Sequence, residues 1–420
     1  MSRSKQWDLV IVGGGTGGLV LALELAKKGY RIAILDRQPR SAAPPRGEIL
    51  QPNGLKVLDR LGLLPDLLNG DTYRNHQVRF RQASGAPLCT VDYQRLPAPY
   101  SYSLILLPEA IQRLLFQKVA VSPDIEIFRG ASFLSILRER EDVAGVEAEQ
   151  EGGRMTLRAP VVVGGDGVRS AVRGAFRIPF KLRLYRDGYL TAVIERPPGF
   201  QAESLYYLGK GTILGAFPVS REKLYLFYMI PAGDLDRYQG EGLDRLKEKI
   251  LSMGPDIRAL LEVPLKRLSS WKEISFMPCF KVRCGTWVVQ GGALLGDAAH
   301  AMNPHVAQGR NSAMEDAMAL AGALEESFRK GDFSRKSLLA YERSRRPPVD
   351  ALQRIGDEMA WLWNSGFAPV VSLRNRVFRG VHAERELHDK MLWTVSGLKT
   401  APFNLYDRWR ALSPRPGPPV

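Results

Sequence analysis

A glycine-rich turn near the start of the chain has the spacing of a dinucleotide-binding loop. Gly13, Gly15 and Gly18 follow the apolar run 9–12 and open a helix-like segment, and Asp36 closes the next apolar run. Glycines at this spacing permit a tight turn, close approach of the backbone to a pyrophosphate, and close packing of helix on strand. The pyrophosphate would lie at the amino end of the helix, where free N–H groups favour negative charge. A glycine turn without a ligand does not explain Asp36, so the segment predicts that a dinucleotide binds.

Two later apolar runs end in turns that carry carboxylates. The run 159–163 leads into a turn with a carboxylate, a flexible glycine and a cation, as expected of a buried strand followed by a binding loop. The run 287–295 leads into a similar turn and then into a helix that we expect to reach about Phe328. Neither run is followed by a second G-x-G-x-x-G. The candidate site residues of these turns are Asp166, Gly167, Gly296, Asp297, Pro304, His305, Gln308, Gly309, Arg310 and Asn311.

The helices and strands that position these turns belong to a long chain. Its 420 residues and 45% hydrophobic content suggest two or three domains. The sequence has no apolar run of about 18 residues and no secretion signal, so we expect a cytoplasmic protein. Its three cysteines lack the spacing of a disulfide framework or a zinc site, and we expect no metal.

The net charge of +15 comes from basic residues scattered among acids, without a recognisable nucleic-acid module, so no nucleic-acid partner is expected. From residue 373 onward, basic and aromatic residues alternate more densely. Two interpretations of this tail stay open. The favoured one is a helical tail docked on the domain, and the other is a tail resting on an anionic bilayer surface.

Segments with alternating hydrophobicity lie between the motifs and predict a sheet. They cover residues 77–91, 189–194, 204–217 and 223–230. Their aromatic side chains suit a flat hydrophobic substrate, although half of the side chains on a strand must point away from any one face. The candidate substrate-binding residues are Tyr206, Phe217, Pro218 and Tyr228.

With the three motifs in this order, the chain resembles the single-component flavoprotein aromatic monooxygenases, which include para-hydroxybenzoate hydroxylase and ubiquinone-biosynthesis hydroxylases. The resemblance covers nearly the whole chain. It implies an α/β fold with a Rossmann-like, GR2-type FAD-binding domain, an interleaved β-sheet substrate domain and a C-terminal helical region. The implied segments are 1–72, 100–178 and 278–345 for the FAD-binding domain, 73–99 and 179–277 for the substrate domain, and 346–420 for the helical region.

The resemblance also implies roles for single residues. Asp297 would bind the ribityl hydroxyls, the turn 308–311 would face the electron-rich edge of the isoalloxazine ring, and Pro304 would lie on the substrate side. His305 is expected to face the pocket as a candidate catalytic residue, with Pro304 and Arg310, whereas His300 is expected to be structural. The implied FAD contacts are Gly13, Gly15, Thr16, Gly17, Gly18, Asp36, Arg37, Arg46, Gln112, Asp166, Gly167, Gly296, Asp297, Gln308, Gly309, Arg310 and Asn311.

Three positions depart from the family pattern. Pro108 stands where the family often has arginine, and Ala307 replaces the first glycine of a G-Q-G turn. The alanine would be strained if its φ were positive. Arg310 replaces a residue that is commonly small or apolar, and three interpretations stay open: it stabilises an anionic flavin, it recruits an anionic substrate, or it points to solvent.

The implied activity is that of an FAD-dependent monooxygenase. NADH or NADPH would reduce FAD in a transient visit, O2 would add at flavin C4a, and the hydroperoxide would hydroxylate or epoxidise an aromatic or quinone-like, lipophilic small molecule, for instance in secondary metabolism. Three alternatives stay open: a reductase of prenyl-lipid double bonds, a flavin-dependent halogenase, and a flavin-binding protein without enzymatic activity. The pair Trp361 and Trp363 resembles a halogenase motif but lacks the following Ile-Pro, and helix packing explains it better.

Overall fold

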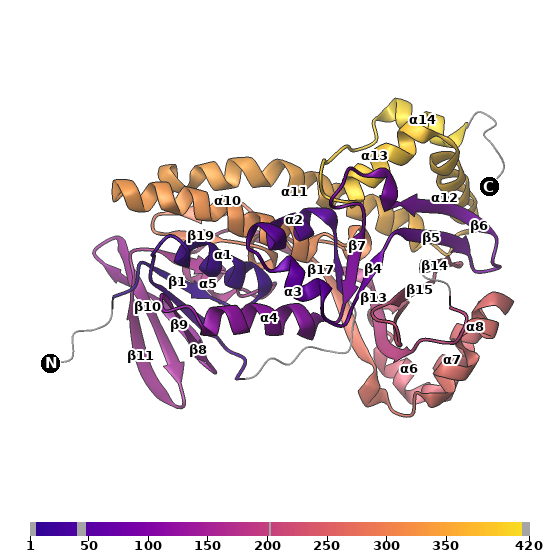
Figure 1. Ribbon diagram of the computed structural model, residues 1–420, viewed down its shortest axis with the longest axis horizontal. Helices are drawn as coiled ribbons and strands as arrows, with labels where there is room; N and C mark the ends of the chain where they lie inside the picture. Colours follow the sequence, from indigo (N-terminus) through magenta and orange to yellow (C-terminus); the bar gives the residue numbers. More distant parts are fainter. Residues whose placement is uncertain (1–5, 40–47, 201–202, 414–420) are drawn as a thin grey trace.

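The computed structural model describes residues 6–39, 48–200 and 203–413 of the chain. Figure 1 shows an elongated molecule with a mainly parallel sheet and its helices at one end and a larger, mainly antiparallel sheet at the other. The carboxyl-terminal helices pack over the second sheet. The predicted α/β fold with a helical carboxyl-terminal region is confirmed.

Short apolar runs build the first sheet. β1 (Leu9–Val12) is buried on both faces, the pattern of a parallel strand that helices cover on either side. It lies between β2 (Ile32–Asp36) and β12 (Val162–Gly164), and both pair with it in parallel. β8 (Ile125–Arg129) extends the sheet beyond β2. The carboxyl ends of β1 and β12 therefore deliver the first two motifs to the same edge.

The apolar run 287–295 does not form the one continuous strand that such a run predicts. The structure has two short strands there, β18 (Val288–Val289) and β19 (Gly292–Leu294), which pair antiparallel. Gly291, at a φ of 64°, lies in the turn between them, so the chain reverses inside the apolar run. Only β19 continues the parallel sheet, beside β12, and it delivers the third motif to the same edge.

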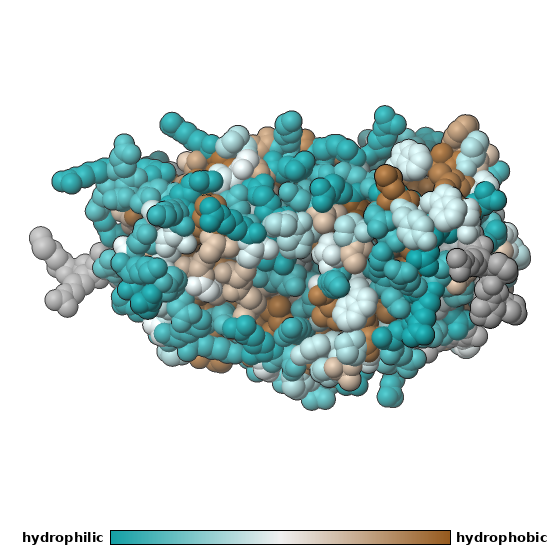
Figure 2. Space-filling model, turned by 90° about the horizontal axis from the view of Figure 1, so that it is seen from above, coloured by the Kyte–Doolittle hydropathy of each residue, from teal (hydrophilic) through white to brown (hydrophobic). Residues whose placement is uncertain are grey.

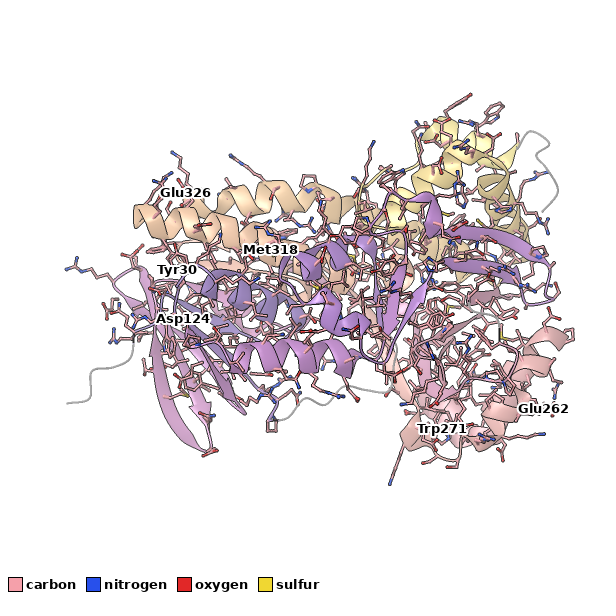
Figure 3. All side chains as sticks on the ribbon, viewed as in Figure 1. Tyr30, Asp124, Glu262, Trp271, Met318 and Glu326 are labelled. Carbon is pink, nitrogen blue, oxygen red and sulfur yellow. The ribbon has the colours of Figure 1, made fainter. Side chains whose placement is uncertain are left out.

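Helices cover this sheet. α1 (Thr16–Ala26) packs against α4 (Pro108–Ala120) and against α10 (Gly309–Lys330), which ends two residues beyond the predicted end. Tyr30 stacks on Phe328 of α10 with ring centroids 4.5 Å apart. Figure 3 shows Tyr30 at this end of the molecule, far from Trp271 and Glu262 in the other lobe.

The second lobe is a seven-stranded sheet in the order β17-β13-β16-β15-β14-β5-β6. All its neighbours are antiparallel except β14 and β5. A bulge in β13 around residues 185–187 shifts its register against β17. β17 continues past residue 277, the expected end of this domain. The strands are β5 (Gln77–Gln82), β6 (Pro87–Asp92), β13 (Phe180–Glu195), β14 (Ser204–Leu208), β15 (Ile213–Pro218), β16 (Lys223–Pro231) and β17 (Ser275–Cys284).

Smaller elements connect and flank the two lobes. β3, β7 and β4 form one three-stranded sheet, and β11, β10 and β9 form another. Their bounds are β3 (Glu48–Leu50), β4 (Thr72–Asn75), β7 (Ser103–Leu106), β9 (Ser132–Glu139), β10 (Asp142–Gln150) and β11 (Gly153–Arg158). The short helices are α2 (Pro52–Arg60), α3 (Leu64–Leu68), α5 (Ala171–Ala175), α6 (Leu235–Glu241), α7 (Leu243–Leu251), α8 (Pro255–Arg267) and α9 (Asp297–His300), with 3-10 turns at Tyr93–Arg95, Trp271–Glu273 and Pro304–Val306.

The carboxyl-terminal tail is helical and docked, as the favoured interpretation predicts. α11 (Arg335–Trp363) leads into α12 (Ala368–Ala383), α13 (Arg385–Val395) and α14 (Leu405–Leu412). Arg374 of α12 is almost fully buried and donates hydrogen bonds to the carbonyl of Leu208 in β14, at 3.3 Å, and to that of Gly209 in the following turn, at 2.8 Å. Within the described ranges, no helix combines the length and the apolar character needed to cross a membrane.

Candidate active site

The first motif forms a glycine loop that approaches the second motif closely. A Cβ on Gly13, whose φ is 112°, would lie 2.3 Å from the carbonyl oxygen of Gly165, and a Cβ on Gly18 would lie 2.5 Å from the carbonyl oxygen of Gly13. Gly15 differs, because the nearest atom to its Cβ would be 3.8 Å away. Gly13 and Gly18 are therefore required by packing, and Gly15 leaves open space above the loop.

Asp36 and Gln112 both reach this loop from other elements. The Asp36 carboxylate lies against Gly14 and accepts a hydrogen bond of 3.1 Å from the N–H of Gln38, and burial raises its pKa. Gln112 on α4 donates a hydrogen bond of 2.6 Å from Nε2 to the Gly14 carbonyl. Arg37 is exposed beside Asp36, and Arg46 lies outside the described residues.

The second motif is a self-supporting turn. Asp166 Oδ2 accepts hydrogen bonds from the N–H groups of Ala171 and Val172, at 2.7 and 3.1 Å, and so caps α5. The other carboxylate oxygen of Asp166 is buried without a partner in the described structure. Arg173, 2% exposed, donates to the carbonyls of Val168 and Ala298, at 2.9 and 2.8 Å. Arg173 thus ties the second motif to the third.

A buried ionic network fixes the third motif. Asp316 of α10 accepts hydrogen bonds from the N–H of Gly296, from His300 Nε2 and from Arg345 Nε, at 3.2, 2.5 and 2.9 Å. Burial acts to raise the pKa of Asp316, but the interactions with His300 and Arg345 outweigh it and hold the pKa below its usual value. His300 is therefore structural, as predicted, and the network holds the turn that presents Asp297.

The turn that follows is held by side chains pointing away from the cavity. Gln308 is fully buried, accepts a hydrogen bond of 3.0 Å from Asn53 and donates to the Val395 carbonyl at 2.9 Å. Asn311 Nδ2 donates to the carbonyl of Ala307 at 2.8 Å and its Oδ1 accepts from the N–H of Gln51. The side chains of Gln308 and Asn311 are thus committed to the protein, and neither residue lines the cavity, whereas Gly309 and Arg310 between them do.

Ala307 takes the left-handed conformation, with a φ of 49° and a ψ of 39°. The strained alternative of the sequence analysis is the one that occurs. A glycine in the same turn would adopt this conformation without a steric penalty.

Arg310 does not point to solvent. It donates from one guanidinium nitrogen to Thr16 Oγ1 and from the other to Glu48 Oε1, the latter at 2.9 Å. Its side chain and that of Glu48 are each 16% exposed. The salt bridge therefore joins the start of α10 to β3, beside the amino end of α1.

The three motifs line one cavity of about 390 Å³. One end is lined by backbone-rich segments, namely Gly15, Thr16, Gly17, Gly18, Gly165, Gly167, Gly296, Asp297, Gly309 and Arg310. The other end is lined by aromatic and sulfur-containing side chains, namely Tyr189, Tyr206, Tyr225, Phe227, Met277 and Met302, with Pro304 and His305. Segments separated by almost 300 residues thus converge on a single space.

The aromatic end is one face of the seven-stranded sheet. Tyr206 lines the cavity, and Phe217 lies behind it, with ring centroids 5.1 Å apart in an edge contact. The prediction that Tyr228 binds the substrate is corrected, because Tyr228 belongs to the opposite face of the sheet and packs in the cluster that contains Tyr238. Pro218 ends β15 next to Phe217 and does not line the cavity either.

The match of a family profile decides the identity of the site. The profile described as FAD binding domain matches residues 6–355, most of the chain. The chain belongs to the FAD binding domain family. It is an FAD-dependent oxidoreductase of the single-component monooxygenase kind, as the motifs predict.

Two curated relatives of this flavoprotein are similar over most of their length. It is 29% identical over 349 residues to 6-methylpretetramide 4-monooxygenase of Streptomyces rimosus, covering 83% of this chain and 82% of the relative. It is 29% identical over 350 residues to 2-heptyl-3-hydroxy-4(1H)-quinolone synthase of Mycobacteroides abscessus, covering 82% and 87%. The solved structure of p-nitrophenol 4-monooxygenase from Pseudomonas putida DLL-E4 shares the fold, with a TM-score of 0.81 at 21% identity over 94% of this chain and all of that one.

The residues of this flavoprotein fit its cofactor. Gly15 leaves room beside the amino end of α1, where backbone N–H groups favour a pyrophosphate. Asp297 lines the same cavity, where a carboxylate suits a diol. Among the described residues, no cluster of three His, Cys, Asp or Glu side chains could hold a metal ion.

His305 lies at the aromatic end of the flavoprotein's cavity and is held on three sides. Its ring stacks on Trp363 with centroids 5.0 Å apart. Nε2 lies 2.8 Å from Asn364 Oδ1, and Nδ1 lies 3.1 Å from the Tyr189 hydroxyl. Burial lowers the pKa of the imidazole to about 4, so His305 is neutral at neutral pH.

Several lining residues escaped the sequence analysis. Tyr189, Phe227 and Met277 line the cavity, and Glu48 pairs with Arg310. Alternation along β16 marked two sets of side chains, but nothing in the sequence said which set faces the cofactor. For Glu48 the sequence carries no signal, because its partner is more than 250 residues away.

Proposed function

We propose that this enzyme uses NADH or NADPH and O2 to hydroxylate or epoxidise an aromatic or quinone-like, lipophilic small molecule. Bound FAD supplies the redox chemistry, because a flavin can take a hydride from a nicotinamide and activate O2. The protein supplies the site. The observation that carries the proposal is one cavity with a glycine-lined end, which suits the cofactor, and an aromatic end, which suits a flat substrate.

We propose the following division of roles within the cavity. The glycine loop with Thr16 holds the pyrophosphate at the amino end of α1, and Asp36 and Arg37 bind the distal nucleotide. Asp297 binds the ribityl hydroxyls, and the N–H groups at 309–311 face the isoalloxazine edge. Pro304, His305 and Tyr206 face the substrate.

Arg310 acts on the cofactor side in this proposal. Its guanidinium is fixed by Thr16 and Glu48 at the glycine-lined end, and its Nε is buried without a partner in the described structure. A fixed cation there stabilises negative charge on a reduced flavin. The interpretation in which Arg310 recruits an anionic substrate is less favoured, because Thr16 and Glu48 hold its guanidinium at the glycine-lined end and not among the aromatic side chains.

The alternatives are disfavoured by the relatives. The names of all three proteins compared above are those of monooxygenases or of a quinolone synthase, and none is that of a reductase or a halogenase. Trp363, part of the halogenase-like pair, packs on His305, Phe80 and Phe378, which is a packing role. The quinolone and the nitrophenol in these names are planar ring compounds, which supports an aromatic substrate here.

Isotope labelling separates these functions. Aromatic candidates are first screened for those that stimulate NADPH oxidation by the FAD-loaded protein, and products are then formed under 18O2. The proposal predicts one labelled oxygen atom in the product. Unlabelled product, or a reduced product without added oxygen, would overturn the monooxygenase proposal.

We also propose that one face of α14 rests on an anionic bilayer. Leu405, Tyr406 and Trp409 are 85%, 62% and 60% exposed, and Figure 2 shows apolar and near-neutral side chains at this end of the molecule. The net charge of +15 favours an anionic surface.

Flotation with phosphatidylserine vesicles tests this contact with the bilayer. The wild type should float and Trp409→Ser should float less, whereas equal recovery of both proteins would overturn the proposal. The predicted cytoplasmic location stays a prediction.

A further inference from the structure

Four side chains form a hydrogen-bonded row that ends in the cavity. Asp187 Oδ2 accepts from Asn364 Nδ2 at 2.9 Å, Asn364 Oδ1 lies 2.8 Å from His305 Nε2, and His305 Nδ1 lies 3.1 Å from the Tyr189 hydroxyl. Asp187 lies in the bulge of β13, Tyr189 follows the bulge, and Asn364 follows the end of α11. The row therefore connects the substrate sheet, the third motif and the long carboxyl-terminal helix.

The chemistry of the donors and acceptors fixes the direction of every hydrogen in the row. An ionised carboxylate only accepts, so the amide NH2 of Asn364 must face Asp187 and its carbonyl must face His305. A carbonyl also only accepts, so His305 Nε2 carries the hydrogen. Nδ1 of the neutral ring is then the acceptor, and the Tyr189 hydroxyl donates to it. The reverse orientation of Asn364 would set a carbonyl oxygen against a carboxylate.

The direction of these hydrogen bonds determines what the Tyr189 hydroxyl can offer to the cavity. The only hydrogen of the Tyr189 hydroxyl is committed to His305, so its oxygen can offer the cavity only lone pairs. Tyr189 is 4% exposed and lines the cavity beside Phe227 and Met277, which carry no strong hydrogen-bonding group. A polar substrate group placed there must donate.

The row does not remove the proton of such a donor. The pKa of His305 is about 4, so at neutral pH its protonation is disfavoured on the order of a thousandfold. Burial also raises the pKa of Tyr189, which keeps its hydroxyl neutral. The ionisable groups that interact with Tyr189 are Cys279, Tyr206, Asp187 and Tyr225, all of them acids, and each acts to raise its pKa further. Arg310 lines the glycine-rich end and is paired with Glu48.

We infer that Tyr189 selects substrates carrying a ring hydroxyl or N–H, which it binds as a neutral hydrogen-bond donor. His305 is positioned by Asn364 and Asp187 to orient Tyr189 and does not act as a base toward the substrate. The inference rests on the proposed function in one respect, namely that this cavity is the substrate site.

Binding of two small probes to the FAD-loaded protein tests the inference without turnover. The probes are 4-nitrophenol and its methyl ether, 4-nitroanisole, in which a methyl group replaces the hydrogen that the phenol can donate. The wild type should bind the phenol about tenfold more tightly, the effect of one hydrogen bond in a dry site. Tyr189→Phe should abolish this preference. The control is Tyr207→Phe, which removes a hydroxyl from the opposite face of the sheet and should keep the preference.

The colour of the bound phenol gives a second readout that needs no variant. At a pH where free 4-nitrophenol is half ionised, binding to the wild type should bleach the yellow phenolate band, because the neutral form binds. A stronger yellow band on binding would overturn the inference, and so would an unchanged preference in Tyr189→Phe. Loss of the preference in Tyr206→Phe alone would assign the role to Tyr206 instead. Both readouts are independent of 18O incorporation, so either proposal can fail alone.

Discussion

At the scale of single residues, the site depends on pairs that are far apart in the sequence. Arg310 is oriented by Glu48, and His305 by Asn364. In each pair one member lies in a recognisable motif and the other does not. The family resemblance predicted that Arg310 and His305 belong to the site, and both line the cavity, but the direction of their side chains could not be predicted, because it depends on the partner.

Ala307 offers a test of backbone strain. Ala307→Gly should raise the free energy of unfolding by up to about 1 kcal/mol, because glycine removes the penalty of the left-handed conformation but adds freedom to the unfolded chain. Urea unfolding measures the change. The control is Ala319→Gly, within α10, which should instead lose about 1 kcal/mol. A destabilised Ala307→Gly protein would contradict the assigned conformation.

His305 predicts a pH dependence of stability. Its pKa is about 4 in the folded protein, below the ordinary value of 6.5, so the unfolded chain takes up the proton first as the pH falls. Stability should therefore decline between about pH 6.5 and pH 4, by no more than roughly 3 kcal/mol from this residue. His305→Gln should show a smaller decline than the wild type in urea unfolding across that range. Parallel profiles would show that His305 is not the titrating group.

At the scale of elements, three strand ends bring the motifs to one edge of the parallel sheet. β1, β12 and β19 are neighbours in the sheet, and each ends in a glycine turn. This arrangement could be predicted from the apolar runs and the turns after them. The reversal at Gly291 could not, because the run 287–295 is apolar on both sides of the turn. The face of each substrate strand was also undetermined, and Tyr228 was assigned to the wrong one.

Gly15 distinguishes binding of the cofactor from folding of the loop. Its φ of −73° suits any residue, and a Cβ there would lie at an ordinary van der Waals distance, 3.8 Å, from the nearest atom. The free energy of unfolding of Gly15→Ala should lie within about 0.5 kcal/mol of that of the wild type, since the substitution causes no backbone strain. The added methyl would enter the cavity, so FAD affinity should fall about tenfold or more. Titration of the flavin-free protein with FAD, followed by flavin fluorescence, measures this affinity.

The matched variant is Gly13→Ala in the same loop. Its φ of 112° and the short distance to the Gly165 carbonyl make the substitution strained, so it should lose both stability and FAD. If Gly15→Ala bound FAD as the wild type does, the cofactor would not lie over this loop.

At the scale of the whole molecule, the cavity exists only because the two lobes meet. The parallel sheet supplies the glycine-lined end, the seven-stranded sheet supplies the aromatic end, and α11 with the residue after it holds His305 between them. The family resemblance predicted this division, whereas composition alone suggested only several domains. The docking of the helical tail was predicted, but its attachment to the substrate sheet through buried Arg374 was not, because arginine is rarely buried.

Binding of FAD is tested most directly by its stoichiometry in the purified full-length protein, measured from the absorbance spectrum and by titration of the flavin-free form. We expect one FAD per chain, released on unfolding and regained on refolding with FAD. A protein that remains colourless after incubation with excess FAD would contradict it.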